Sequence, residues 1–113
     1  MSGKSGVVIT LPQKISIDKT EVLKGKLEKL KENYPGIALD FRKVEEIDAS
    51  GIQLLAAFAL GCVNDSKEFN CLGPLNESIR ENLTLSGILV SDSGDEYLFP
   101  FLYTEGVKIE SGR

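Results

Sequence analysis

The chain has 113 residues and a formal net charge of −4, with 42% hydrophobic and 27% charged residues. This length suits one domain with a core of its own. The acidic balance and the lack of a basic run argue against nucleic acid as a partner. Histidine is absent from the sequence, which removes the commonest general base and the commonest metal ligand.

The N-terminal residues are polar, and the first apolar run starts only at Val7. They lack the apolar core of a secretory signal, and the longest apolar run, residues 54–63, is too short to span a membrane. We therefore expect a cytoplasmic protein. Cys62 and Cys71 have neither CxxC spacing nor histidine neighbours, so we expect two buried free thiols, with no metal or cofactor.

The first third of the chain predicts two strands and a helix. Residues 7–11 are short and β-branched, which is typical of a strand, and residues 15–17 predict a second short one. An amphipathic helix follows from Asp18, with leucines at i, i+4 and i+7 on one face. Pro35 ends it, because proline cannot continue a helix.

The middle of the chain alternates strands and helices. Residues 37–41 and 68–72 predict strands, and residues 42–46 predict an acidic turn. Residues 50–63 predict a helix that is largely buried, since its apolar stripe is too wide for a surface helix, and residues 74–86 predict another. The order β(β)αβαβα indicates right-handed crossovers, so we expect an α/β fold with a mainly parallel or mixed sheet of four to five strands.

The pattern changes after residue 88. Residues 91–96 predict a polar loop, residues 97–103 are aromatic but interrupted by a proline, and the remainder predicts a frayed end with one short strand at 107–109. We therefore expect a domain over residues 1–90 and a C-terminal extension over residues 91–113. The aromatic run is expected to pack on its own domain; a dimer or partner contact is the alternative, which leaves the oligomeric state open.

Four carboxylates lie close together in the sequence, at Asp40, Glu45, Glu46 and Asp48. Paired carboxylates can perform acid–base chemistry or bind magnesium. Here no nearby base or nucleophile completes such a site, so a solvated acidic turn is the better interpretation, and we do not expect an enzyme.

Ser50 stands where a helix begins, and two interpretations compete for it. Unpaired N–H groups and the helix dipole make this position suitable for a phosphate. The spacing from Ser50 to Gln53 is also that of a capping box, in which the serine oxygen accepts a hydrogen bond from the Gln53 N–H. A cap stabilises a helix by about 1 kcal/mol, which is reason enough for a serine.

The segment around this serine carries a family pattern. A hydrophobic strand ends in Asp40, a short turn follows, and Asp48-Ala49-Ser50-Gly51-Ile52 opens an apolar helix. Residues 39–55 thus resemble the signature segment of STAS domains, named for sulphate transporters and anti-sigma factor antagonists. Residues 73–88 look like the next helix of that family, which often ends in a hydrophobic-Ser/Thr-Gly-hydrophobic turn. The resemblance covers residues 7–90.

The resemblance implies a function and a site. In anti-sigma factor antagonists, the serine or threonine before the glycine is phosphorylated by the cognate anti-sigma factor, which is a kinase. Ser50 matches that position, so the implied function is a non-enzymatic protein-binding regulator whose partner is a kinase-type anti-sigma factor. The implied partner-binding surface comprises Glu45, Glu46, Asp48, Ala49, Ser50, Gly51 and Ile52. A phosphate among these acidic groups would repel a docked partner.

A second function stays open. Some STAS domains are constitutive subunits of transport, chemotaxis or stressosome complexes, and in such a protein Ser50 would be only a helix cap.

Overall fold

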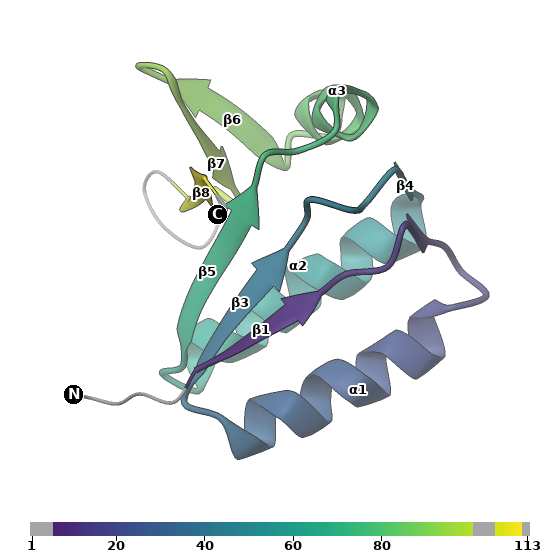
Figure 1. Cartoon of the computed structure of the whole chain (residues 1–113), viewed down its shortest axis with the longest axis vertical. Coiled ribbons are helices and arrows are strands. Elements are labelled where there is room, and N and C mark those ends of the chain that lie inside the picture. The colour runs from purple at the N-terminus through teal and green to yellow at the C-terminus, as the bar shows by residue number, and fades with distance from the viewer. Residues whose placement is uncertain (1–5, 101–105, 112–113) are drawn as a thin grey trace.

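The computed structural model describes residues 6–100 and 106–111, and within these ranges the chain forms a six-stranded sheet and a separate two-stranded one. The strand order of the large sheet is β1-β3-β5-β8-β7-β6 (Figure 1). Its strands are β1 (Val7–Thr10), β3 (Gly36–Asp40), β5 (Glu68–Gly73), β8 (Val107–Ser111), β7 (Asp95–Leu98) and β6 (Leu89–Asp92). Strands β1, β3, β5 and β8 are parallel, whereas β7 and β6 are antiparallel. The predicted α/β class with a mainly parallel sheet is confirmed.

Two long helices cover one face of the parallel strands. Helix α1 (Thr20–Asn33) and helix α2 (Ala49–Asn64) pack against each other, α1 on β3 and α2 on β5. Alternate strand residues that face them are buried. These are Ile9, Ile37, Leu39, Phe69 and Cys71. Burying each large apolar side chain contributes about 1.5–3 kcal/mol, so this layer forms the main core.

Cys62 and Cys71 are both free and buried in that core, as the sequence predicts. Burial raises the pKa of the Cys62 thiol to about 11 and raises the pKa of Cys71 further. Both side chains therefore behave as small apolar groups rather than as reactive thiolates.

The two-stranded sheet lies where β1 and β3 end. Strand β2 (Lys14–Ile15) follows β1 and strand β4 (Glu46–Ile47) follows β3, and the two pair in parallel. Their inward residues, Ile15 and Ile47, are buried. Helix α3 (Glu77–Leu85) lies near β4, because the Asn82 side-chain N–H donates to the Ile47 carbonyl over 3.2 Å. The start of α2 therefore lies at the carboxyl edge of the sheet, beside two short strands and a third helix.

The expected polar loop at residues 91–96 is wrong, because this segment forms a hairpin. Strands β6 and β7 pair from Leu89↔Leu98 to Asp92↔Asp95. The two residues between them, Ser93 and Gly94, have φ of 53° and 86°. Positive φ at both central positions is what a type I′ hairpin turn requires, and a Ser-Gly pair tolerates it. This hairpin and β8 raise the strand number of the large sheet above the predicted four to five.

The chain continues in the same sheet beyond residue 90. Strand β8 contains the predicted short strand at 107–109 and lies between β5 and β7, with Cys71 opposite Ile109 and Leu98 opposite Val107. Part of the aromatic run packs on the core, because Leu98 and Phe99 are buried and the rings of Phe69 and Phe99 are 6.2 Å apart. Residues 101–103 of that run lie outside the described residues.

Candidate functional site

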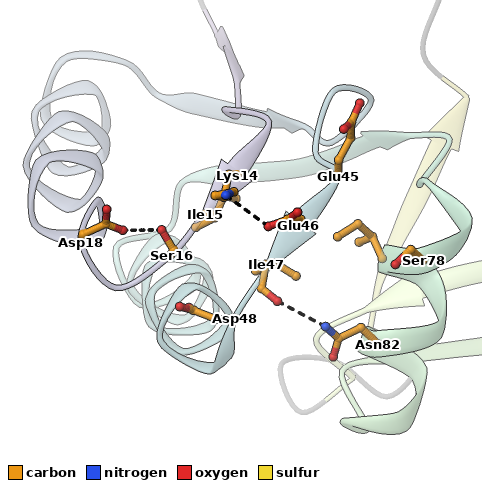
Figure 2. Close-up of a pocket in the computed structure, with 11 residues that line it drawn as sticks. Lys14, Ile15, Ser16, Asp18, Glu45, Glu46, Ile47, Asp48, Ser78 and Asn82 are labelled. Atoms are coloured by element: carbon orange, nitrogen blue, oxygen red, sulfur yellow. Dashed lines mark hydrogen bonds and ion pairs between the residues drawn. The ribbon is translucent and has the colours of Figure 1, made fainter.

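A surface pocket of about 510 Å³ lies at the carboxyl edge of the sheet, between the two-stranded sheet and α3. Figure 2 shows Ser16 and Asp18 on one side of it, Ser78 and Asn82 on the other, and β4 between them. Its lining residues are Lys14, Ile15, Ser16, Asp18, Glu45, Glu46, Ile47, Asp48, Ser78, Ile79 and Asn82. Four of these carry carboxylates and one carries an ammonium group, so the lining of the pocket has a net negative charge.

Asp48 is the N-cap of α2, so the interpretation of Ser50 as the helix cap, one of the two left open by the sequence, is wrong. The Asp48 backbone is extended, and its Oδ1 accepts a hydrogen bond from the Gly51 N–H over 2.9 Å. Aspartate satisfies an unpaired N–H as well as serine does, and it also complements the helix dipole. The helix begins one residue earlier than predicted, at Ala49, so Ser50 already lies within its first turn.

Ser50 is half-buried, and its hydroxyl points back to the cap. Its Oγ donates a hydrogen bond to Asp48 Oδ1 over 2.8 Å. The N–H of Gly51 and then the Ser50 hydroxyl hold the pKa of Asp48 below its usual value, so this carboxylate is ionised at neutral pH. The serine therefore acts as a hydrogen-bond donor to a negative group, rather than as the acceptor that a capping box requires.

The glycine after Ser50 permits close packing of α2 on the two-stranded sheet. Gly51 is buried, and an added Cβ there would lie 2.7 Å from Ile15 Cγ2, 2.8 Å from the Ile15 carbonyl oxygen and 2.9 Å from Ile47 Cγ1. No larger residue fits without a shift of backbone. Gly51 thus lets the start of α2, which carries Ser50, pack directly on Ile15 and Ile47, two residues that line the pocket.

The other predicted site residues lie around this helix start. Ala49 is exposed and Ile52 is half-buried, while Glu45 and Glu46 are exposed beside the pocket. Glu46 forms an ion pair with Lys14 over 3.5 Å. Because both groups are exposed, this pair adds little stability, but it leaves the acidic character of the surface largely in place.

Asp40 does not belong to this surface. It ends β3 with only 4% of its surface exposed, so its prediction as part of a solvated acidic turn is wrong. Both of its oxygens are occupied by Arg42, whose Nε donates to Oδ1 over 2.9 Å and whose Nη2 donates to Oδ2 over 2.7 Å. The hydrogen bonds of the Arg42 side chain hold the pKa of Asp40 below its usual value.

Three solved structures are similar to this chain at low sequence identity. Phosphorylated SpoIIAA, a Bacillus cell fate determinant, gives a TM-score of 0.59 at 20% identity, over 77% of this chain and 79% of that chain. The anti-sigma factor antagonist SpoIIAA in its unphosphorylated form gives 0.62 at 20% identity, over 77% and 76%. An anti-sigma factor antagonist from Mycobacterium paratuberculosis gives 0.64 at 17% identity, over 77% and 74%. The chain has the STAS fold of the anti-sigma factor antagonists.

No protein-family model and no curated protein matches the sequence. The STAS fold is therefore recognised through its architecture, in which α2 opens beside the carboxyl ends of β1 and β3 and presents Ser50 at the surface. Over the described residues, no helix has both the length and the apolar character that a membrane crossing needs. Within 6–100 and 106–111, no three histidine, cysteine or acidic side chains gather as metal ligands would.

The STAS fold also brings residues to this site that the sequence did not predict. Ile17 donates its backbone N–H to Asp48 Oδ2 over 3.0 Å, although 31 residues separate the two. Ser16, Asp18, Ser78 and Asn82 line the pocket from the α1 and α3 sides. The pairing of β2 with β4 brings Ser16 and Asp18 to this site, and the packing of α3 near β4 brings Ser78 and Asn82. These are contacts between segments distant in the chain, so the local sequence does not assign these four residues to the site.

Proposed function

We propose that this protein is a non-enzymatic regulator that binds a kinase-type anti-sigma factor and is released when Ser50 is phosphorylated. The observation that carries the proposal is the place of Ser50: it lies half-buried in the first turn of α2 and donates its hydroxyl hydrogen to Asp48, which lines the same pocket as Glu45 and Glu46. The similarity to SpoIIAA, whose structure is known in phosphorylated and unphosphorylated forms, supports the same kind of modification here. A cytoplasmic location is part of the proposal.

The electrostatics of this surface support a switch. A phosphate adds about −1.5 to −2 charges at neutral pH. The first turn of α2 tolerates an anion, so the fold should survive the modification. A partner that docks over Ser50 with no basic group opposite it would, however, have to desolvate a doubly charged, hydrated group at the centre of its contact, and any acidic group that it places there would be repelled. A loss of about 3 kcal/mol of binding free energy raises the Kd roughly 150-fold, which is enough for release.

The experiment compares phosphorylation and binding in a matched set of variants. The purified protein is incubated with the candidate partner kinase and ATP, and the phosphate is located by mass spectrometry. Binding to the partner is then measured calorimetrically for wild type, Ser50→Ala, Ser50→Asp and Ser78→Asp. Ser78 is an exposed serine of α3 that lines the pocket beside which Ser50 is bonded to Asp48, so Ser78→Asp adds the same charge at a different place.

We expect phosphate on Ser50 only, binding by Ser50→Ala that is close to wild type, and at least tenfold weaker binding by Ser50→Asp than by Ser78→Asp, about 1.4 kcal/mol. Phosphate on another residue, or equal binding by wild type and Ser50→Asp, would rule out the switch.

A constitutive STAS subunit of a larger complex is the second candidate function. It is favoured by the hydrogen bond from Ser50 to Asp48, which gives the hydroxyl a structural role without any kinase. In that case Ser50 should remain unmodified in protein isolated from its own cells, and both Ser50→Ala and Ser50→Asp should retain partner binding. Mass spectrometry of the native protein separates the two functions.

A further inference from the structure

We propose that phosphorylation of Ser50 releases the loop that precedes α1, residues 16–19, by withdrawing the Asp48 carboxylate from the amide of Ile17. This inference rests on the proposed function for the phosphate itself. It adds a second consequence of the modification. The phosphate changes the charge of the partner-binding surface, and it also changes the position of the loop beside that surface.

Asp48 joins two segments of the chain, the first turn of α2 and the loop before α1, through one carboxylate that accepts from three donors. Its Oδ1 accepts from the Gly51 N–H over 2.9 Å and from the Ser50 hydroxyl over 2.8 Å. Its Oδ2 accepts from the Ile17 N–H over 3.0 Å. The position of the carboxylate thus depends on α2, and the position of residue 17 depends on the carboxylate.

Phosphorylation changes the hydrogen bond that Ser50 makes. The Ser50 Oγ forms a bond to the γ-phosphorus of ATP, the bond from that phosphorus to the ADP oxygen breaks, and the hydroxyl proton leaves to solvent. Oγ then has no hydrogen to donate. A dianionic group also stands within a few bond lengths of Asp48 Oδ1, which is itself ionised because its neighbours hold its pKa low.

The phosphate also competes with Asp48 for its donors. Phosphate oxygens on a first-turn serine can accept from the unpaired N–H groups of the same turn, including that of Gly51. The Asp48 side chain is then repelled and has lost one donor to Oδ1 outright, so it turns towards solvent. Its backbone stays in place, because the Asp48 N–H donates to the Ile15 carbonyl over 3.1 Å. The Ile17 amide, which lies outside the first turn of α2, is left without its acceptor.

The loop that is released is compact and carries an exposed apolar side chain. Its own turn is held by a hydrogen bond from the Lys19 N–H to the Ser16 carbonyl over 2.8 Å, and by one from Thr20 Oγ1 to the Ile17 carbonyl over 3.1 Å. It therefore moves as a unit. Ile17 has 72% of its surface exposed beside the acidic pocket. A partner that docks here would contact this apolar group next to the carboxylates of Asp18 and Asp48, and would lose its alignment when the loop is freed.

The test uses amide hydrogen exchange by nitrogen-15 NMR, on the full chain with phosphoserine incorporated directly at position 50. No kinase is needed, so the release of the loop is tested even if the partner named in the proposed function is wrong. We expect the Ile17 amide to exchange roughly tenfold faster, or more, in the phosphorylated chain, as for the loss of a hydrogen bond to a charged acceptor. The Gly51 amide should stay protected, because phosphate replaces Asp48 as its acceptor.

Two variants of the unphosphorylated chain complete the test. Asp48→Ala should reproduce the faster exchange of Ile17, whereas Glu45→Ala, which removes an exposed carboxylate from the same surface, should leave it unchanged. The Ile17 amide could exchange at the same rate with and without the phosphate, while Asp48→Ala accelerates its exchange. That result would overturn the release of the loop by phosphorylation and would leave the electrostatic switch intact. Equal exchange rates of the Ile17 amide in wild type and Asp48→Ala would show that the hydrogen bond from Ile17 to Asp48 does not hold the loop.

Discussion

Ser50 donates its hydroxyl hydrogen to Asp48 Oδ1 over 2.8 Å, and it is Asp48 that closes the start of α2. The serine is thus held in place by a carboxylate that would repel the phosphate of the proposed modification. A hydroxyl with this geometry is available at the surface and is oriented by a fixed carboxylate. The same carboxylate connects the helix to the loop before α1 through Ile17.

The two residues should differ in their contribution to stability. Asp48→Ala removes the helix cap and the acceptor of the Ile17 amide, so we expect a clear loss of stability, of the size typical for an N-cap. Ser50→Ala removes one donor at the surface and inserts a better helix former, so its unfolding free energy should lie within about 0.5 kcal/mol of wild type. Urea denaturation of both variants measures the difference. A larger loss of unfolding free energy for Ser50→Ala than for Asp48→Ala would show that the serine, and not Asp48, stabilises the start of the helix.

Gly51 should be intolerant of a methyl group, although alanine is the better helix former. An added Cβ would meet side-chain and backbone atoms of Ile15 at 2.7 and 2.8 Å. We expect Gly51→Ala to lower the unfolding free energy by about 1–3 kcal/mol through overpacking. Gly25 is the matched control: it lies in α1 with nothing within 4 Å of its added Cβ, so Gly25→Ala should stabilise by about 0.5–1 kcal/mol. Equal effects of the two substitutions in urea denaturation would contradict the close approach at Gly51.

The sequence predicted the parts of this fold that depend on local pattern. Apolar periodicity placed α1 and α2, the β-branched runs placed β1 and β3, and the motif at residues 48–52 led to the STAS fold. The predicted surface residues Glu45, Glu46 and Ser50 lie just before and just within the start of α2, and their role in partner binding stays a prediction.

What the sequence missed depends on contacts between distant segments or on competition between similar residues. Asp48 and Ser50 are both good N-caps at neighbouring positions, and only the backbone path into α2 decides between them. The acidic cluster in the sequence predicts a solvated Asp40, whereas the sheet buries this residue and Arg42 pairs with it. The hairpin at Ser93 and Gly94 lies in a polar stretch, so alternation of apolar residues, the usual strand signal, is weak there.

Strand β8 should be indispensable for folding, so residues 91–113 should not behave as an extension that can be removed from the domain. It lies between β5 and β7, so its removal would expose an edge of β5 and detach the β6–β7 hairpin from the parallel strands. We expect a chain that ends at Pro100 to lose cooperative thermal unfolding, followed by circular dichroism. A chain that lacks only residues 112 and 113 serves as the control and should unfold as wild type does. A cooperative transition in the chain ending at Pro100 would support the division at residue 90.

The ion pair between Asp40 and Arg42 should make stability depend on pH in the acid range. Arg42 holds the pKa of Asp40 below the value of about 3.9 that an unfolded chain has. Between the two values the unfolded state binds more protons, so the contribution of Asp40 is complete above the unfolded pKa and is lost as pH falls through the folded one. Stability should therefore decrease as the medium is acidified through this window.

Asp40→Asn isolates this contribution. At pH 7 we expect the variant to lose about 1.5 kcal/mol, the value for hydrogen bonds to a charged group, and no more, because 40% of the Arg42 side chain is exposed and can be rehydrated. The gap between wild type and variant should narrow in urea denaturations from about pH 5 to about pH 2, because wild-type Asp40 becomes protonated there. Glu45→Gln, which neutralises an exposed carboxylate, should keep the steep acid limb of wild type. A constant gap over this range would show that Asp40 contributes through packing rather than through its charge.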